Sequence, residues 1–268
     1  MSKQAKRVAL LTGGSSGIGL STVRMLIGRN WTVYTMSRRP CPVAEARFVQ
    51  GDVNDETSVR LVIQTVIAEQ GQLDALICCA GNGLAGAVED CTSDEVAYQF
   101  QTTWFGLDKT IRACLPTMRK QGGGTIITIS SVAAVVPIPF QTYYSAAKAA
   151  ILHYTKALSL EVRAWNIRCS CILPGDTKTG FTAARRYAVA SQSDESAYGV
   201  KMKDSVGRME RDEQNGMSPD KIARAICRQL DKRHPAISVV PGWNYKLFAL
   251  LVRILPNRFV LRVVGMLY

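Results

Sequence analysis

A short apolar run that leads into a glycine-rich loop and then into a helical pattern constrains this chain more than any other feature. Val8-Ala-Leu-Leu11 precedes Thr12-Gly13-Gly14-Ser15-Ser16-Gly17-Ile18-Gly19, and apolar residues then recur at Leu20, Val23, Leu26 and Ile27. Strand, glycine loop and helix in this order present bare backbone N–H groups and a helix N-terminus to a pyrophosphate. The glycine spacing is G-x-x-x-G-x-G and not the common G-x-G-x-x-G, so a plain turn stays open as an alternative.

The alternation of strand-like and helical patterns continues along the chain. Further strands are expected at 32–36, 47–50, 73–77, 125–129, 167–173 and 236–240, and the helices between them include 103–118, 143–164 and 219–231. This alternation predicts an α/β fold, a parallel sheet with helices on both faces. The 268 residues are 47% hydrophobic and show no linker or repeat, so we expect one Rossmann-type, doubly wound domain of about seven strands.

The ends of these strands carry the features that suit a dinucleotide, because ligands of such sheets bind at the carboxyl ends. The second strand ends in Ser37-Arg38-Arg39, where an acid would bind the ribose hydroxyls of NAD and an arginine suits the 2′-phosphate of NADP. No acid is present, which predicts NADP; a solvated loop is the alternative. Asp52 can reach the adenine amino group, and the small residues of Cys78-Cys79-Ala80-Gly81-Asn82-Gly83 let backbone approach a flat ring.

The candidate chemistry lies at Ser131 and within residues 144–148. If a helix begins near Tyr143, Tyr144 and Lys148 share one face because they stand four residues apart. A phenol with a pKa of about 10 is a poor proton carrier at neutral pH, and a fixed cation lowers that pKa. Ser131 follows an apolar strand and can point its hydroxyl at the oxygen that the tyrosine protonates. Y-x-x-x-K alone recurs by chance, so the rest of the chain decides.

Composition limits the partners and the compartment. The net charge is +12, which can indicate a nucleic acid, an anionic membrane or an anionic ligand. No nucleic-acid motif appears, which favours a solvated surface together with a phosphate-binding site. The eight cysteines are scattered and only two histidines are present, so we expect neither disulfides nor a metal site. Residues 1–7 show no signal-peptide core, which predicts a cytoplasmic protein.

Taken in order, these motifs resemble those of the short-chain dehydrogenase/reductase family over about residues 7–242. The resemblance rests on Thr12-Gly13-x-x-x-Gly17-Ile18-Gly19, Asp52-Val53, Ala80-Gly81, Ser131, Tyr144-x-x-x-Lys148 and Pro174-Gly175. Ser131 lies 13 residues before Tyr144, a spacing that the family commonly shows. Together the motifs are far more specific than any one of them.

The resemblance implies a role for each of the matching residues. Tyr144 is the general acid/base, Ser131 positions the substrate oxygen, and Lys148 lowers the tyrosine pKa and holds the nicotinamide ribose. Arg38 is the expected ligand of the 2′-phosphate. The expected cofactor-binding residues are Gly13, Ser15, Ser16, Gly17, Ile18, Gly19, Ser37, Arg38, Asp52, Val53, Ala80, Gly81, Tyr144, Lys148, Pro174, Gly175, Thr177 and Thr179, the two threonines at the nicotinamide amide or the phosphates.

Two positions depart from the family pattern. The family's Asn-Asn-Ala-Gly is Cys78-Cys79-Ala80-Gly81 here, and Thr103 stands where an asparagine that helps to hold a proton-relay water is expected. A threonine hydroxyl can still bind water. Thr103 is therefore kept as a catalytic candidate, and relayed proton exchange is expected to be altered and not lost.

Two segments are expected to enclose the substrate. Residues 176–217, within a catalytic domain of residues 1–242, correspond to the segment that closes over the substrate in the family; an ordinary polar insertion is the alternative. Residues 243–268 form an apolar tail with four basic and no acidic residues, too interrupted to span a membrane. The tail covers an apolar pocket or a partner subunit, which we favour, or lies on a membrane surface. It is similar to the C-terminal helices of family members that act on steroids, retinoids and related lipids.

The expected function is hydride transfer between NADP(H) and a secondary alcohol or ketone of a small apolar substrate, with a hydroxysteroid as the first candidate. Retinoids, acyl-lipid ketones and small xenobiotic carbonyls are the alternatives among enzymes. A non-catalytic NADP-binding sensor or scaffold is the alternative of another class, although the intact Ser131, Tyr144 and Lys148 argue against it. Family members usually associate through the helices that correspond to 103–118 and 144–164, so a homodimer or homotetramer is expected.

Overall fold

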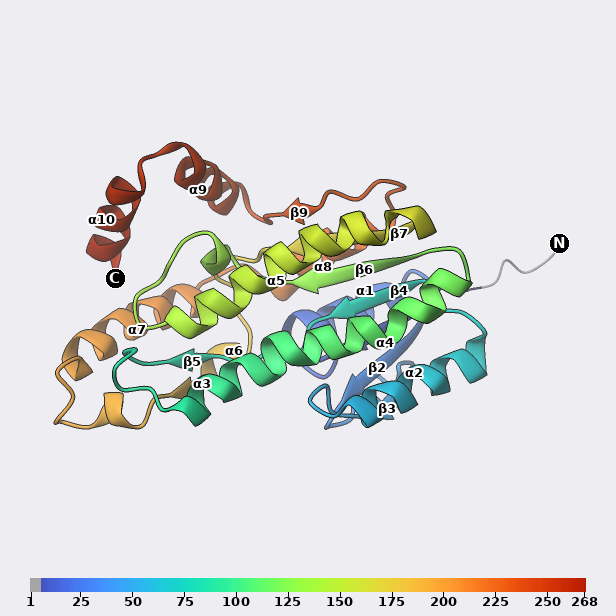
Figure 1. The fold of residues 1–268 in the computed structure, drawn as a ribbon, viewed down its shortest axis with the longest axis horizontal. Coiled ribbons are helices and arrows are strands. Elements are labelled where there is room, and N and C mark those ends of the chain that lie inside the picture. Colours follow the sequence, from blue (N-terminus) through green and yellow to red (C-terminus); the bar gives the residue numbers. More distant parts are fainter. Residues whose placement is uncertain (1–5) are drawn as a thin grey trace.

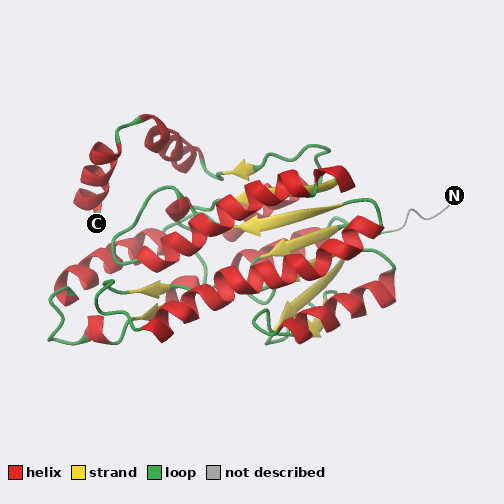
Figure 2. Ribbon diagram, in the orientation of Figure 1, coloured by secondary structure: helices red, strands yellow, loops and turns green. Residues whose placement is uncertain are grey.

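A parallel seven-stranded sheet with helices on both faces organises the residues that the computed structural model describes, 6–268, as Figure 1 and Figure 2 show. Its strands are β1 (Val8–Thr12), β2 (Thr32–Ser37), β3 (Arg47–Gln50), β4 (Ala75–Cys78), β6 (Gly124–Ile129), β7 (Ile167–Ile172) and β9 (Ser238–Val239). They lie in the order β3-β2-β1-β4-β6-β7-β9, and every neighbouring pair is parallel. The predicted single Rossmann-type, doubly wound domain is confirmed.

The burial of the strands explains why helices cover both faces. All five residues of β1 are buried, as expected for a central strand of a parallel sheet. Because side chains alternate along a strand, Val8 and Leu10 belong to the core on one face, whereas Ala9 and Leu11 belong to the core on the other. The first core packs against α2 (Glu56–Gln70), α4 (Gly106–Lys120) and α5 (Thr142–Glu161), and the second packs against α1 (Gly17–Ile27) and α8 (Pro219–Leu230).

Local sequence signals fix several helix ends. The Asp55 side chain caps α2 by accepting a hydrogen bond from the Thr57 N–H, and Gly71 ends this helix with φ at +70°. Ser218 caps α8 in the same way, and Pro219 occupies the first turn. These are the residues that helix ends favour, since a short polar side chain satisfies a free N–H and glycine adopts a positive φ without strain.

The observed boundaries differ from the expected ones mainly around Thr103. The expected helix 103–118 begins only at Gly106, because a π-helical turn, Gln101–Phe105, joins it to α3 (Ser93–Phe100). The helix that contains Tyr144 ends at Glu161, and residues Arg163–Trp165 form a short 3-10 turn. The strand ends lie within two residues of those expected.

Apart from α8 and β9, the chain after β7 builds a group of elements beside the main sheet. It contains α6 (Phe181–Ala184), β8 (Arg186–Tyr187), a 3-10 turn (Ala190–Gln192), α7 (Gly199–Gln214), α9 (Trp243–Ile254) and α10 (Asn257–Leu267). β8 pairs in parallel with β5 (Leu84–Ala85). The two strands form a small second sheet that the sequence did not indicate. Figure 1 shows α9 and α10 at the end of the molecule where α7 lies, and Tyr268 packs against the cluster that includes Met202 and Met209 of α7.

The topology places the functional end of the sheet. The strand order changes direction between β1 and β4, and a ligand of such a sheet binds outside the carboxyl ends of the strands at that point. No helix within residues 6–268 is both long and apolar enough to cross a membrane. Residues 1–5, on which the expected lack of a leader sequence partly rests, lie outside the described residues.

Candidate active site

The glycine loop after β1 brings backbone segments into close contact. Gly13 has φ at +71°, and a Cβ on it would lie 2.8 Å from the Ala80 nitrogen. A Cβ on Gly19 would lie 2.1 Å from the Gly13 oxygen. Both positions are therefore closed to a side chain. Within the described chain the Ser16 side chain caps no N–H of α1, so the first N–H groups of this helix are available to an anion.

A cavity of about 980 Å³ lies at the carboxyl ends of the strands, and most of the predicted site residues form its wall. These residues are Gly13, Ser15, Ser16, Gly17, Ile18, Gly19, Arg38, Ala80, Gly81, Ser131, Tyr144, Lys148, Pro174, Gly175, Thr177 and Thr179. Ser37, Asp52, Val53 and Thr103 were predicted but do not belong to the lining. The wall also contains polar residues that the sequence did not single out, among them Asn54, Tyr98, Gln101, Thr102, Asp176, Arg186, Glu213 and Tyr245.

The loop after β2 presents two arginines to one end of this cavity. Arg38 and Arg39 are exposed, line the cavity and form no ion pair with any residue of 6–268. The Ser37 hydroxyl donates a hydrogen bond of 2.7 Å to the Arg39 carbonyl and so helps to shape the turn. The two guanidinium groups are free to bind an anion.

The loop after β3 presents Asn54 where Asp52 was expected. The Asp52 carboxylate accepts a hydrogen bond of 2.9 Å from the Asn54 N–H, which closes a local turn. Val53 packs under α4, where a Cβ on Gly106 would lie 2.7 Å from the valine methyl group. Asn54 itself reaches the cavity, and its Nδ2 donates to the Thr102 hydroxyl at 3.2 Å. The predicted contact between Asp52 and adenine stays a prediction.

Tyr144, Lys148 and Ser131 come together as the sequence predicted. Tyr144 and Lys148 lie in the first two turns of α5, and the Lys148 Nζ is 5.6 Å from the centre of the Tyr144 ring. Lys148 is buried and donates a hydrogen bond of 3.0 Å to the Ile129 carbonyl at the end of β6. The Ser130 hydroxyl donates to the Lys148 carbonyl at 2.6 Å, which joins the helix to the strand from which Ser131 projects.

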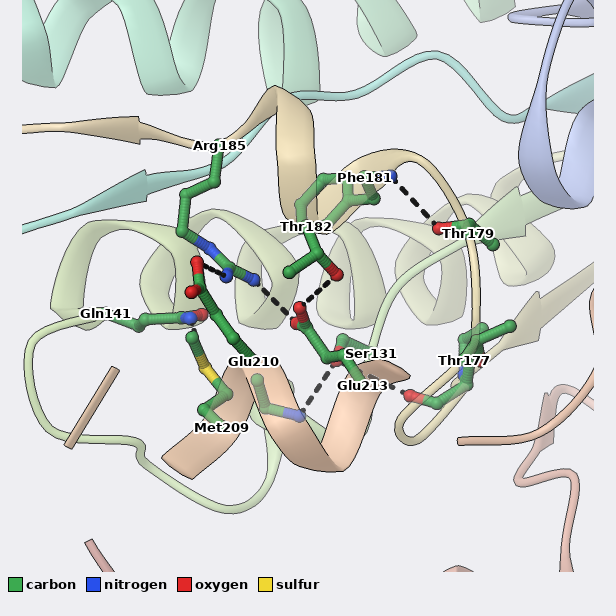
Figure 3. Close-up of polar contacts among 12 residues, drawn as sticks. Ser131, Gln141, Thr177, Thr179, Phe181, Thr182, Arg185, Met209, Glu210 and Glu213 are labelled. Atoms are coloured by element: carbon green, nitrogen blue, oxygen red, sulfur yellow. Dashed lines mark hydrogen bonds and ion pairs between the residues drawn. The ribbon is translucent and has the colours of Figure 1, made fainter. Parts of the chain in front are cut away.

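Ser131 caps the 3-10 turn Val132–Ala134 that follows β6. Its Oγ accepts a hydrogen bond of 3.1 Å from the Ala133 N–H and donates a long one, 3.4 Å, to the Pro174 carbonyl. Figure 3 shows the Ser131 side chain with its hydrogen bonds as dashed lines. The hydroxyl is thus held by the backbone of two neighbouring strand ends while it lines the cavity.

Burial sets the protonation of the two titratable groups. It raises the pKa of Tyr144 to about 12; the Ser131 hydroxyl opposes this shift and the Glu213 carboxylate adds to it. Burial also lowers the pKa of Lys148 to about 8. Burial of the phenol is the main cause of this shift, and the predicted lowering of the tyrosine pKa by Lys148 stays a prediction. At neutral pH the Tyr144 phenol is protonated and can act as a proton donor.

Thr103 is buried in a hydrogen-bond network and does not reach the cavity. Its Oγ1 donates to the Asn82 Oδ1 at 2.7 Å and accepts from the Gln99 Nε2 at 3.0 Å and the Asn82 N–H at 3.3 Å. One donated and two accepted hydrogen bonds saturate a hydroxyl. The expected water-holding role of Thr103 therefore does not fit this arrangement, and the threonine instead fixes Asn82 beside Gly81. Gln99 was missed, although it lies one helical turn before Thr103.

The cysteines are free thiols throughout the chain. Cys79 lines the cavity, and burial raises the pKa of its thiol to about 12. At neutral pH it is therefore an uncharged thiol, a poor nucleophile, next to the loop where the backbone approaches the cavity. Its place in the wall matches the expectation that small residues allow close approach there.

A buried ion-pair network organises the segment that the sequence predicted as a lid. The Arg185 side chain is 1% exposed, and its guanidinium binds Glu210 at 3.2 Å and Glu213 at 2.6 Å. Glu213 also accepts a hydrogen bond of 2.6 Å from the Thr182 hydroxyl, as Figure 3 shows. Arg185 follows α6 whereas both glutamates belong to α7, so the network holds these two helices together.

The same segment is fixed at its ends and lies close to the catalytic candidates. The Met217 N–H donates to the Asp176 carbonyl at 2.8 Å, and the Lys178 N–H donates to the Met217 carbonyl at 2.9 Å. The predicted boundaries 176 and 217 thus coincide with paired backbone. Between them, the Phe181 ring centre lies 5.7 Å from that of Tyr144.

The tail contributes to the cavity wall with both of its helices. Tyr245 and Phe248 of α9 and Val264, Leu267 and Tyr268 near the chain end line the cavity. Other large apolar side chains of the tail are exposed, including Trp243, Leu250, Ile254, Phe259, Leu261 and Met266. The tail therefore has apolar groups on the cavity side and on the outside.

Comparisons with known proteins agree with this geometry. A sequence model of the short chain dehydrogenase family matches residues 7–189. A 3-ketodihydrosphingosine reductase of Bacteroides thetaiotaomicron is 38% identical over 237 residues, which cover 88% of each chain. A short-chain dehydrogenase of Streptomyces avermitilis has a similar structure, with a TM-score of 0.78 and 28% identity over 91% of this chain and 92% of the other. A Burkholderia phymatum short-chain dehydrogenase/reductase in complex with NAD shares the fold, with a TM-score of 0.81 and 20% identity over 94% of each chain.

The match of the family model, the likeness of the bacterial reductase and the cluster at Ser131, Tyr144 and Lys148 agree with one another. This chain is an oxidoreductase of the short-chain dehydrogenase/reductase family that acts on CH–OH or carbonyl groups.

Proposed function

We propose that this chain is an NADP(H)-dependent reductase of a keto group in a long-chain, apolar lipid. The observation that carries the proposal is the continuity of one cavity from the glycine loop past Ser131 and Tyr144 to the lid and the tail. Its far part is lined by the apolar side chains of Val136, Ile138, Phe181, Met209, Phe248, Val264 and Leu267. Such a wall suits an apolar substrate whose carbonyl reaches the polar end.

Each residue at the polar end of the cavity has its own role in the proposed reaction. In the reduction, the Tyr144 phenol donates a proton to the carbonyl oxygen, and the Ser131 hydroxyl donates a hydrogen bond to the same oxygen as its negative charge grows. A bound nicotinamide dinucleotide supplies the hydride. Lys148, held by the Ile129 carbonyl, keeps a positive charge beside the phenolate that remains. The lid and the tail exclude water from the reacting carbon.

The wall of the cavity fits a dinucleotide, and its arginines favour the phosphorylated form. The positions of Gly13 and Gly19 are closed to side chains, which leaves the loop backbone bare for a pyrophosphate. Arg38 and Arg39 supply two cations at the end of β2, where no acid is present to bind ribose hydroxyls. NAD is the competing cofactor, because similar folds are known with NAD and with NADP.

The substrate class follows from the apolar wall and the Bacteroides relative. That relative is named for 3-ketodihydrosphingosine, a long-chain lipid ketone, which we place first among the substrates of this chain. The hydroxysteroid expected from the tail stays a prediction, as do the retinoid, acyl-lipid and small-carbonyl alternatives. A homodimer or homotetramer and a cytoplasmic location also stay predictions.

The outer surface of the tail favours contact with a lipid bilayer as a second proposal. Exposed apolar side chains, such as Ile254 at 71% and Phe259 at 53%, alternate with basic ones, and the tail has no acidic residue. An anionic bilayer complements this combination of charge and apolar surface. Contact there would bring the cavity close to the source of an apolar substrate.

A substrate panel tests the main proposal. NADPH oxidation is followed with 3-ketodihydrosphingosine, keto-steroids, retinal and small carbonyls, each also with NADH. We expect the highest kcat/KM for the long-chain ketone with NADPH. Turnover confined to small carbonyls would contradict the assignment of an apolar lipid, and equal use of NADH would contradict the role of the arginines.

A further inference from the structure

Asp176 places a carboxylate in the cavity wall that the chemistry above does not use. It follows Pro174-Gly175 after β7, lines the cavity and is partly buried. Its Oδ2 accepts a hydrogen bond of 2.8 Å from the Tyr245 hydroxyl of α9. The Tyr245 ring packs against Gly175, where a Cβ would lie 2.3 Å from the ring. The aromatic ring and its hydroxyl therefore hold the carboxylate in one orientation.

No cation of the described chain neutralises this carboxylate. Within residues 6–268, no Lys, Arg or His nitrogen lies within 4.0 Å of it, and the buried Arg185 is engaged by Glu210 and Glu213. Burial raises the pKa of Asp176, the Tyr245 hydroxyl opposes this shift, and the carboxylates of Asp212 and Glu213 add to it. Removing a carboxylate from water without a cation is unfavourable, so a positively charged ligand group would stabilise this part of the wall.

The carboxylate lies close to the reacting centre. Asp176 is two residues after Pro174, whose carbonyl accepts the hydrogen bond from Ser131. The charges of Glu213 and Asp176 are also near enough to raise the pKa of the Tyr144 phenol. Of these two acids, Glu213 already has the Arg185 guanidinium as its partner. Asp176 is thus the one of the pair that can receive a cation from a substrate whose carbonyl faces Tyr144.

We propose that Asp176, oriented by Tyr245, binds a protonated amine that the substrate carries on the carbon next to its reacting carbonyl. This inference rests on the proposed function and narrows its substrate class from apolar ketones to long-chain α-amino ketones. A charge-assisted hydrogen bond from an ammonium group is roughly twice as strong as a neutral one, so the pair would also orient the carbonyl. 3-Ketodihydrosphingosine, after which the Bacteroides relative is named, has an amine on the carbon beside its ketone.

Asp176 also has a structural role, since it anchors α9 through Tyr245. The test must separate this role from the binding of an ammonium group. Asp176→Asn separates the two roles, because the amide oxygen still accepts the tyrosine hydrogen bond while the negative charge is lost. Asp212→Asn is the matched control: it removes a neighbouring carboxylate that is exposed and outside the cavity wall. Tyr245→Phe keeps the charge and removes only the orienting hydrogen bond.

The experiment compares kcat/KM for an α-amino ketone and for a ketone of the same chain length without the amine. In Asp176→Asn we expect kcat/KM to fall about 100-fold more for the amino ketone than for the plain ketone, because breaking one side of a buried charged pair is costly and only the amino ketone forms that pair. Asp212→Asn should leave both values within about threefold. In Tyr245→Phe the amino ketone should lose about tenfold. Equal losses for both ketones in Asp176→Asn, or no loss for either, would overturn the proposal.

A binding measurement keeps this test separate from the proposed function. Calorimetry compares a soluble alkyl amine with the alcohol of the same chain length, using the intact protein, and we expect the amine to bind about tenfold more tightly. This preference should disappear in Asp176→Asn. If the protein reduces neither ketone, the proposed function fails, but calorimetry still decides on Asp176. Equal affinities for amine and alcohol in the unsubstituted protein would overturn the ammonium site without any variant.

Discussion

The Thr103→Val substitution tests whether this residue holds the site together or takes part in proton relay. Valine keeps the shape of threonine but removes the hydroxyl that makes three hydrogen bonds. Gln99 keeps a partner, because its Nε2 also donates to the Asn82 backbone and side-chain oxygens at 3.2 Å. The Asn82 N–H keeps no partner among residues 6–268. One partly buried donor left without a partner corresponds to a loss of about 2 kcal/mol in the free energy of unfolding.

Urea denaturation of Thr103→Val and Thr103→Ser measures this loss, and kcat with a lipid ketone measures the effect on turnover. Serine keeps the hydroxyl and should retain most of the hydrogen-bond contribution. We expect valine to lower the free energy of unfolding while kcat falls only severalfold, since Thr103 does not reach the cavity. Unchanged unfolding together with a loss of kcat above about 100-fold, the scale of general acid–base catalysis, would refute this reasoning and favour a proton relay through Thr103.

Three further predictions concern the cofactor, the buried lysine and the tail. Arg38→Asp should weaken NADPH binding and improve the relative use of NADH, as measured by fluorescence titration; an unchanged preference would show that the phosphate site lies elsewhere. Lys148→Met should abolish turnover yet raise the free energy of unfolding at pH 7 by roughly 1–3 kcal/mol, because it removes a buried ammonium whose pKa is lowered to about 8. Between about pH 8 and 10.5 the unfolded chain binds more protons than the folded one, so the free energy of unfolding of the unsubstituted protein rises with pH. The difference in this free energy between Lys148→Met and the unsubstituted protein should therefore shrink. A difference that does not depend on pH would contradict the buried ammonium as its cause. Ile254→Ser combined with Phe259→Ser should reduce sedimentation with anionic vesicles whereas Leu61→Ser, an equally exposed site on α2, should not, and equal pelleting of all three proteins would remove the membrane proposal.

Much of the fold and part of the site could be predicted because the signals are local. Most strands of the main sheet lie in short apolar runs bounded by turn residues, and the glycine loop, Ser131 and the pair Tyr144 and Lys148 are fixed by short spacings. Helical spacing alone places Lys148 one turn after Tyr144. The order of the strands then brings these separate segments to one edge of the sheet.

The features that could not be predicted depend on contacts between distant parts of the chain. Asp176 and Tyr245 are 69 residues apart, and only the folded tail brings the tyrosine hydroxyl to the carboxylate. The environment of Thr103 depends on a π-helical turn and on Asn82 from another loop, neither of which has a sequence signature. The raised pKa of Tyr144 likewise follows from burial under the lid, a property that residue spacing does not contain.

The lid and the tail show the same limit. In the sequence, Arg185 is one of many basic residues in a charged stretch. In the structure its side chain is almost completely buried and is paired with Glu210 and Glu213 of α7. The sequence left open whether the apolar side chains of the tail cover a pocket, a partner subunit or a membrane surface, and in the structure some of them line the cavity whereas others are exposed. Apolar periodicity identifies amphipathic helices but cannot assign two apolar faces to two different environments.

The measurement that tests the central claim most directly is the reduction of 3-ketodihydrosphingosine with NADPH by Tyr144→Phe and by its neighbour control Tyr143→Phe. Tyr143 does not belong to the cavity lining, whereas the Tyr144 phenol faces the cavity and is protonated at neutral pH. We expect Tyr144→Phe to bind NADPH normally and to lose at least about 100-fold in kcat, while Tyr143→Phe retains turnover. Equal turnover by the two variants would contradict the assignment of Tyr144 as the proton donor, and with it the proposed reaction.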